Sequence, residues 1–340
     1  MWNVKGHDWA VERLRSAIIH DRVGHAWLFT GPSQVGRTHL ATKFAQALNC
    51  ESEYPENRPC GVCRKCKLIA SGRHPDLRLI KPTVGSRGTE TIKIDQIREL
   101  QQDLNRTAME GPYKIAIVSS FDAANPAAAN AFLKTLEEPP RNVVLILTAS
   151  EADALLPTIN SRCRTINLRP VPLAIIQDHL EQDMGVPSDK AKTLAHLANG
   201  RIGWAINAAS EPDAIETYSS KTEQLSQILE MNKVDRFKLA DKLASKPENL
   251  PDLFRIWLGW WRDALIISSG QNVENQIINL LFQQDNATLN VSQETKSFMN
   301  DENINLMTFP ALGLELNLIE NLWAEISRIY IRMERFMPIG

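Results

Sequence analysis

The sequence predicts an α/β domain built on a parallel sheet, followed by a remainder that is entirely helical. Three short apolar runs carry the first part of this prediction, at residues 26–30, 115–118 and 143–148. Each run lies next to a stretch whose apolar residues recur at helical spacing. Wholly apolar strands that alternate with helices are typical of a parallel sheet covered on both faces. Beyond residue 168 the strand pattern fades and helical spacing dominates.

The remaining elements follow from the same two periodicities. The first strand ends at Gly31 and Pro32, which interrupt the apolar run. Trp257, Trp260 and Trp261 share one face of a late helix, which we interpret as helix–helix core. We expect further strands at 77–80 and 165–168, helices at 38–48, 94–104 and 127–136, short helices at 173–184, 188–199 and 203–209, and longer helices at 253–267 and 312–336.

Length and composition are those of a globular protein with two or three domains. The chain has 340 residues, of which 43% are hydrophobic and 23% charged, which excludes the disordered, collagen-like and coiled-coil classes. A formal net charge of −2 argues against a protein that coats nucleic acid with a basic surface. The longest apolar stretch, 253–267, is shorter than the roughly 20 residues of a membrane helix, and the N-terminus shows no secretory signal. We therefore expect a cytoplasmic protein without a membrane contact.

Residues 31–38 fit the phosphate-loop spacing G-x-x-x-x-G-K-[ST] except at one position, and they lie between a predicted strand and helix as that motif requires. Gly31, Gly36, Arg37 and Thr38 are the candidate nucleotide-binding residues. Arg37 stands where the motif has lysine, and its planar guanidinium is not an equivalent replacement for a compact ammonium group. We expect the loop to lack hydrolysis, and the sequence leaves ATP or ADP binding open.

The strand that should supply the acidic pair of a nucleotide hydrolase lacks it. Mg²⁺ needs an aspartate at the tip of a neighbouring strand, and the attacking water needs a positioned acceptor. The strand at 115–118 is followed by Ser119 and Ser120, and the first carboxylate after it is Asp122. The absence of lysine and of both acidic groups predicts a nucleotide-hydrolase fold that does not hydrolyse.

Four of the five cysteines form a compact metal-binding pattern. Cys50, Cys60, Cys63 and Cys66 have the spacing C-x9-C-x2-C-x2-C, while Cys163 stands alone. Four thiolates can close a tetrahedral Zn²⁺ site in a short module that has little core of its own. We favour a zinc ion over free or redox-active thiols, because two overlapping C-x2-C pairs are hard to explain otherwise. We expect its role to be structural, because a closed four-cysteine site leaves no position for a reacting water.

Two further segments give a specific resemblance. Residues 128–140 read Ala-Ala-Asn-Ala-Phe-Leu-Lys-Thr-Leu-Glu-Glu-Pro-Pro, and residues 161–163 read Ser-Arg-Cys. With the phosphate loop and the cysteine cluster, their order over about residues 1–210 resembles the AAA+ clamp-loader subunits of bacterial DNA polymerase III. The resemblance implies a degenerate AAA+ P-loop domain at 1–167 with a zinc module at 50–66, a helical lid domain at 168–210, and a helical collar and oligomerisation domain at 211–340.

The resemblance also implies a role for Arg162 in another subunit. In the family the Ser-Arg-Cys arginine projects into the ATP site of a neighbouring gamma or tau subunit, where it offsets charge on the transferring phosphoryl group. The departures from the motifs favour a non-hydrolysing subunit, and Gly203 occupies a position where active subunits are expected to carry arginine. Thr148 stands at the position of a phosphate sensor. The implied partners are gamma or tau and delta subunits in a hetero-oligomer, and, through the complex, the sliding clamp and primer–template DNA.

Two other functions remain open on the sequence. One is an ATP-hydrolysing motor, of the gamma or tau type or a related AAA+ ATPase, with Arg37 in the place of lysine. The other is a zinc-bearing nucleic-acid adaptor, which the acidic charge balance disfavours. The first interpretation makes the isolated chain a non-enzyme that works as a subunit of a DNA-directed DNA polymerase, a nucleotidyltransferase.

Overall fold

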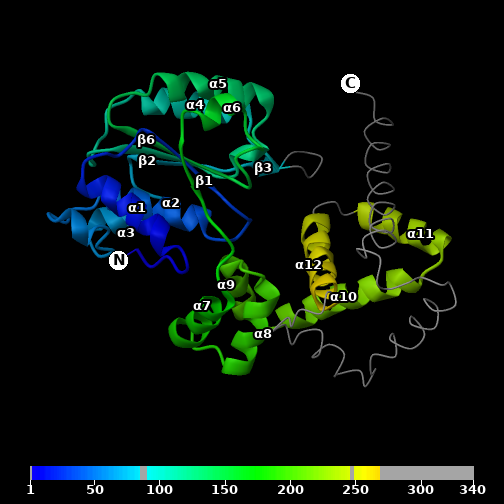
Figure 1. The fold of residues 1–340 in the computed structure, drawn as a ribbon. Coiled ribbons are helices and arrows are strands. Elements are labelled where there is room, and N and C mark those ends of the chain that lie inside the picture. Colours follow the sequence, from blue (N-terminus) through cyan, green and yellow to red (C-terminus); the bar gives the residue numbers. More distant parts are fainter. Residues whose placement is uncertain (1, 85–89, 246–248, 269–340) are drawn as a thin grey trace. The chain divides into compact units, whose positions relative to one another are not determined.

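The computed structural model describes residues 2–84, 90–245 and 249–268 of the 340-residue chain (Figure 1). The chain divides into two compact units, Met1–Tyr218 and Ser219–Gly340. Within the described ranges no helix is long and apolar enough to cross a membrane. The predicted domain boundaries after residues 167 and 210 stay predictions, and the helix predicted at 312–336 lies outside the described residues.

The first unit begins with alternating helices and strands and ends with short helices. Its strands are β1 (Ala26–Thr30), β2 (Leu77–Ile80), β3 (Thr83–Val84), β4 (Glu90–Thr91), β5 (Lys114–Val118), β6 (Val143–Ala149) and β7 (Arg164–Asn167). Its helices are α1 (Asp8–Ile19), α2 (Arg37–Leu48), α3 (Arg64–Ala70), α4 (Ile94–Leu104), α5 (Pro126–Glu137), α6 (Pro157–Asn160), α7 (Leu173–Asp178), α8 (Ser188–Ala198) and α9 (Ile202–Ser210). Short 3-10 turns lie at Pro55–Asn57 and Phe121–Ala123, and a π-helical turn at His179–Asp183 extends α7.

The sheet confirms the predicted parallel α/β core. Its strand order is β2-β5-β6-β1-β7, and every neighbouring pair is parallel. Helices α1, α2 and α3 cover one face and α4, α5 and α6 cover the other (Figure 1). Side chains of β1 alternate between the two layers: Trp27 and Phe29 pack with the α1 and α2 residues, and Leu28 packs with the α4 and α5 residues. Burial on both faces explains why these strands are wholly apolar.

Most predicted helices are present, with ends set by local capping. The helix predicted at 127–136 begins at Pro126, because Asn125 accepts a hydrogen bond from the Ala128 N–H and proline fits the first helical position. The helix predicted at 173–184 is divided between α7 and the π-helical turn. Helices α1 and α3 were not predicted, since α1 buries only Ala10 and Leu14 completely and its apolar periodicity is weak.

The second unit contains helices that pack through the aromatic face. Its described elements are α10 (Ala214–Glu230), which begins in the first unit, α11 (Lys233–Ala244) and α12 (Leu250–Ser268). Trp257 on α12 is 4% exposed, and its indole N–H donates to the Lys221 carbonyl at 2.9 Å. The interpretation of this tryptophan as helix–helix core is confirmed.

A buried carboxylate joins β2 to the loop before β5. Asp76 is fully buried and accepts three backbone hydrogen bonds, from the N–H groups of Met109, Glu110 and Gly111 at 2.6 to 2.8 Å. Burial acts to raise the pKa of Asp76, but these donors outweigh it and hold that pKa below its ordinary value. Asp76 therefore stabilises the fold in its charged form.

We expect Asp76→Asn to lower the free energy of unfolding by about 2 kcal/mol at neutral pH, because an amide oxygen replaces the charged acceptor of buried donors. The folded-state pKa is depressed, so the wild-type advantage is complete above the unfolded pKa and is lost as the pH falls through the folded pKa. Urea denaturation of both chains between pH 3 and pH 7 measures this difference. Asp95→Asn, at an exposed carboxylate, is the control. An equal loss in the control, or a difference independent of pH, would contradict the prediction.

Candidate functional site

The phosphate loop follows β1 directly and has a conformation that only glycine allows at its first position. Gly31 has φ +138°, and a Cβ atom there would lie 2.4 Å from the Leu168 carbonyl oxygen. Its N–H donates to the Ser150 carbonyl at 3.0 Å. Gly36, at φ +113°, precedes the first helical residue, Arg37. Gly31 to Gly36 therefore form a loop between β1 and α2, in the predicted order of strand, loop and helix.

Two contacts from elsewhere in the chain hold this loop. The Gly203 N–H donates to the Gln34 carbonyl at 2.8 Å, and a Cβ at Gly203 would come within 2.9 Å of the same oxygen. The His7 Nε2 lies 3.0 Å from the Val35 carbonyl. A carbonyl only accepts, so His7 Nε2 carries a proton, while burial lowers the pKa of His7. At Gly203, where the resemblance predicts an arginine in active subunits, the backbone of α9 lies against the loop.

Arg37 is a partly buried cation with an incomplete set of partners. Burial lowers the pKa of Arg37, and Asp122 acts in the opposite direction. Within the described chain its Nη1 has no hydrogen-bond partner. The Asp122 carboxylate itself accepts from the Ser150 N–H and hydroxyl, at 3.0 and 2.5 Å. The positions of Gly31, Gly36, Arg37 and Thr38 match a phosphate loop, and nucleotide binding at these residues stays a prediction.

Polar groups at the neighbouring strand ends bind the chain itself. The Ser120 N–H donates to the Thr148 hydroxyl at 2.9 Å, and Thr148 is 1% exposed. The Ser119 N–H donates to the Ile80 carbonyl at 2.9 Å. The hydroxyl at the predicted sensor position thus holds the turn after β5. No carboxylate stands at the two residues directly after β5, in agreement with the sequence.

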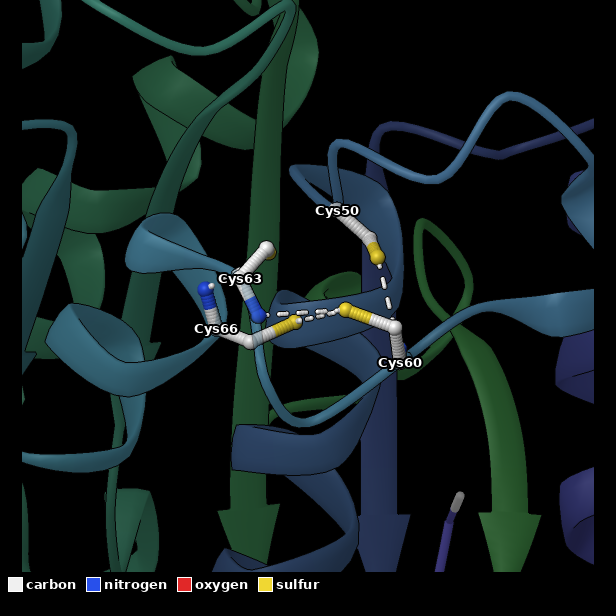
Figure 2. A group of neighbouring side chains, drawn as sticks. All are labelled: Cys50, Cys60, Cys63 and Cys66. Carbon is white, nitrogen blue, oxygen red and sulfur yellow. Dashed lines mark hydrogen bonds between the residues drawn. The ribbon is translucent and has the colours of Figure 1, made fainter.

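The four cysteines of the predicted metal site converge (Figure 2). Cys50 follows α2, Cys60 lies in the loop, Cys63 is the N-cap of α3, and Cys66 lies in its first turn. Their Sγ atoms all lie within 4.8 Å of one another. In a tetrahedral site with Zn–S bonds of about 2.3 Å, the sulfur atoms are about 3.8 Å apart. A small contraction of the observed cluster would therefore give this geometry.

Backbone N–H groups point at several of these sulfur atoms, an arrangement that favours thiolates. The Cys60 N–H approaches Cys50 Sγ at 3.3 Å, the Cys63 N–H approaches Cys60 Sγ at 3.3 Å, and the Cys66 N–H approaches Cys63 Sγ at 3.4 Å. Burial acts to raise the pKa of Cys60, but donors including the Cys63 N–H lower it to about 6.

The other cysteines of the cluster resist ionisation when no cation is present. Burial raises the pKa of Cys50 and, more strongly, that of Cys66. Four thiolates this close repel one another, and a divalent cation offsets that repulsion. The donor set, its spacing and its N–H contacts therefore fit a metal ion with sulfur ligands.

Arg162 is fixed by three contacts at the end of α6. Its Nη2 pairs with Glu137 Oε1 at 2.8 Å, and its Nη1 donates to the Thr158 carbonyl at 2.8 Å and to the Ser161 hydroxyl at 3.4 Å. A guanidinium has five N–H groups, so two remain for another ligand. Burial raises the pKa of the adjacent Cys163 to about 12, which keeps this thiol protonated and unreactive.

The structure separates Arg162 from the phosphate loop of its own chain. Arg164 begins β7 and lies opposite Trp27, the second residue of β1, in a parallel pair. Arg162 therefore stands at the amino edge of the sheet, while Gly31 follows β1 at the carboxyl edge. The ion pair with Glu137 was not predicted, because no local spacing signals a contact between residues 25 positions apart.

Comparison with known proteins places this arrangement in a family. The family model described as DNA polymerase III, delta subunit matches residues 6–172. The delta-prime subunit of DNA polymerase III from Bacillus subtilis is 35% identical over 66% of this chain and 65% of its own length. The delta-prime subunit from Pseudomonas aeruginosa is 39% identical over 41% of each chain. The tau subunit of Escherichia coli is 29% identical over 67% of this chain and 35% of its own length.

The match spans less than two thirds of each of these three relatives. The region matched by the family model, residues 6–172, contains the five-stranded sheet, the phosphate loop, the cysteine cluster and Arg162. These matches show that the chain belongs to the delta-prime family of bacterial DNA polymerase III subunits.

Proposed function

We propose that the chain is a non-hydrolysing delta-prime subunit of a clamp-loader complex, and that it supplies Arg162 in trans to the ATP site of a neighbouring gamma or tau subunit. This step would act during the loading of the sliding clamp onto primed DNA. The observation that carries the proposal is the position of Arg162, which is fixed at the amino edge of the sheet, with two N–H groups left and its own phosphate loop at the opposite edge.

The chemistry of Arg162 fits this role. Charge spreads over the oxygens of the transferring phosphoryl group, and a guanidinium brought from a second subunit can offset it. A side chain already held by Glu137 and Thr158 loses little further conformational freedom when it makes that contact. The loop of this chain lacks its lysine and the end of β5 lacks the acidic pair, so the subunit would contribute the arginine without turning over ATP itself.

The test uses the complete complex of this chain with its gamma or tau and delta subunits, together with clamp and primed DNA. We expect Arg162→Ala to slow hydrolysis at the one recipient ATP site by about 10³-fold or more, while the complex still assembles. In a single-turnover experiment, the amplitude of the fast phase of ATP hydrolysis should then fall by the fraction that one site contributes. Arg169→Ala, at an exposed arginine, is the control. An unchanged fast phase in an intact Arg162→Ala complex would contradict the proposal.

Glu137 is a positioning residue in this scheme, and a double-variant cycle tests it. We expect Glu137→Ala to slow the same fast phase about 3- to 10-fold, since it removes the carboxylate that orients Arg162. Glu137→Gln, which keeps an acceptor oxygen, should slow the fast phase less, and Glu138→Ala should leave its rate unchanged. The variant with both Arg162→Ala and Glu137→Ala should match Arg162→Ala alone. Additive losses in that variant would show that Glu137 acts independently of Arg162.

We propose further that the four-cysteine cluster holds a structural Zn²⁺ ion. The ligands would be Cys50, Cys60, Cys63 and Cys66, and the ion would join the end of α2 to the start of α3. The residues between them offer little core, because Tyr54 and Val62 are 62% and 72% exposed. An ion bound only in the folded state adds its binding free energy to stability.

We expect the purified chain to contain one zinc ion per molecule. Cys60→Ser should abolish that content and lower the thermal midpoint by about 5 °C or more, since a loss of about 2 kcal/mol shifts a domain of this size by several degrees. Metal analysis and calorimetry measure both effects. Cys163→Ser removes a cysteine outside the cluster and should keep the zinc. A metal-free wild type, or equal metal loss in the Cys163 variant, would contradict the zinc assignment.

A further inference from the structure

A cavity of about 420 Å³ lies at the amino edge of the sheet, between the C-terminal half of α1 and the starts of β1 and β7. Three arginines line it, Arg13, Arg22 and Arg164, together with His20 and Ser16. No carboxylate is among the lining residues in the part of the chain that the structure describes. The cavity therefore gathers positive charge without an internal counter-charge.

The guanidinium of Arg164 is held in place by contacts within the chain. Its Nη1 donates to the Arg22 carbonyl at 2.7 Å, and its Cζ lies 5.6 Å from the centre of the Trp27 ring. A Cβ at Gly24 would lie 2.7 Å from Arg164 Nε, so glycine makes room for this side chain. These contacts use one N–H donor and the flat face of the group, and they leave the other donors for a ligand.

The end of α1 does not cancel this charge. The Arg22 N–H donates to the Ala17 carbonyl at 2.8 Å and the Asp21 N–H to the Ile18 carbonyl at 3.2 Å, so these terminal carbonyls are satisfied. Asp21 lies between His20 and Arg22 in the sequence and is not among the residues that line the cavity.

His20 adds a polar group at the same helix end. Its Nδ1 lies 2.9 Å from the Ser16 carbonyl. Since that oxygen only accepts, Nδ1 carries a proton, and this hydrogen bond therefore determines the tautomer of the ring.

We infer that this cavity binds the phosphodiester backbone of DNA. Guanidinium forks pair with phosphate oxygens in a bidentate manner, and three of them surround the cavity. Trp27 is 1% exposed and therefore offers no free ring face on which a base could stack. The contact is with the charged backbone and is independent of the base sequence. The choice of DNA among phosphate compounds rests on the proposed function.

The cavity is separate from the Arg162 site. Trp27 packs in the layer that contains α1, whereas Glu137, the partner of Arg162, belongs to α5 on the other face of the sheet. One small positive region on a chain of net charge −2 also agrees with a local DNA contact rather than a broad basic surface. Loss of the DNA contact would therefore leave the arginine-finger chemistry intact.

The test measures binding of a fluorescein-labelled 20-base-pair duplex with a single-stranded overhang to the full chain, over a series of KCl concentrations. We expect Arg13→Ala with Arg22→Ala to weaken binding about tenfold or more at low salt, and to reduce the slope of log affinity against log salt by about 2. The matched control, Lys67→Ala with Arg73→Ala, removes the same charge from exposed positions after the cysteine cluster and should bind within twofold of the wild type.

Three outcomes would overturn the inference: no salt-dependent DNA binding by the wild type, an equal loss in the control, or unchanged binding in the cavity variant. A second arm titrates inorganic triphosphate and ADP. Saturable binding of either compound that the cavity variant loses while it keeps DNA binding would assign the cavity to a free phosphate compound instead. The ATP-turnover test of Arg162 fails or succeeds independently of these results.

Discussion

The parallel register of the five-stranded sheet is the constraint on which the rest of the structure depends. Because β1, β5, β6 and β7 all run in one direction, every carboxyl end lies at one edge and every amino end at the other. The phosphate loop and the turn after β5 meet at the first edge. Arg162 and the arginine-lined cavity both lie at the second edge, associated with opposite faces of the sheet. One chain therefore presents two chemically different edges.

At the carboxyl edge, polar groups around the phosphate loop bind the chain itself. Thr148 accepts from the Ser120 N–H, Asp122 accepts from Ser150, and Gly203 lies against Gln34. The Thr148 contact satisfies a buried hydroxyl that would otherwise destabilise the fold, whereas the Asp122 and Gln34 contacts join exposed loop groups. The loop thus keeps the backbone of a phosphate site, and its polar surroundings serve structure.

The sequence predicts the parts of this molecule whose signal is local. Buried strands such as β6 form continuous apolar runs, and the loop glycines stand at the fixed spacing of their motif. The cysteines of the cluster lie within seventeen positions. The contacts that it could not predict join distant segments: Glu137 with Arg162, and Arg164 with Arg22. These pairs depend on strand order and register, which periodicity does not reveal.

Hydrolysis of ATP by the isolated full-length chain, with Mg²⁺ present, tests the central claim most directly. We expect no turnover by the wild type, because the loop lacks its lysine and β5 is followed by Ser119 and Ser120. A variant that combines Arg37→Lys, Ser119→Asp and Ser120→Glu gives the matched comparison for restored chemistry. Turnover by the wild-type chain itself would contradict the account and would identify the chain as an ATP-driven motor subunit.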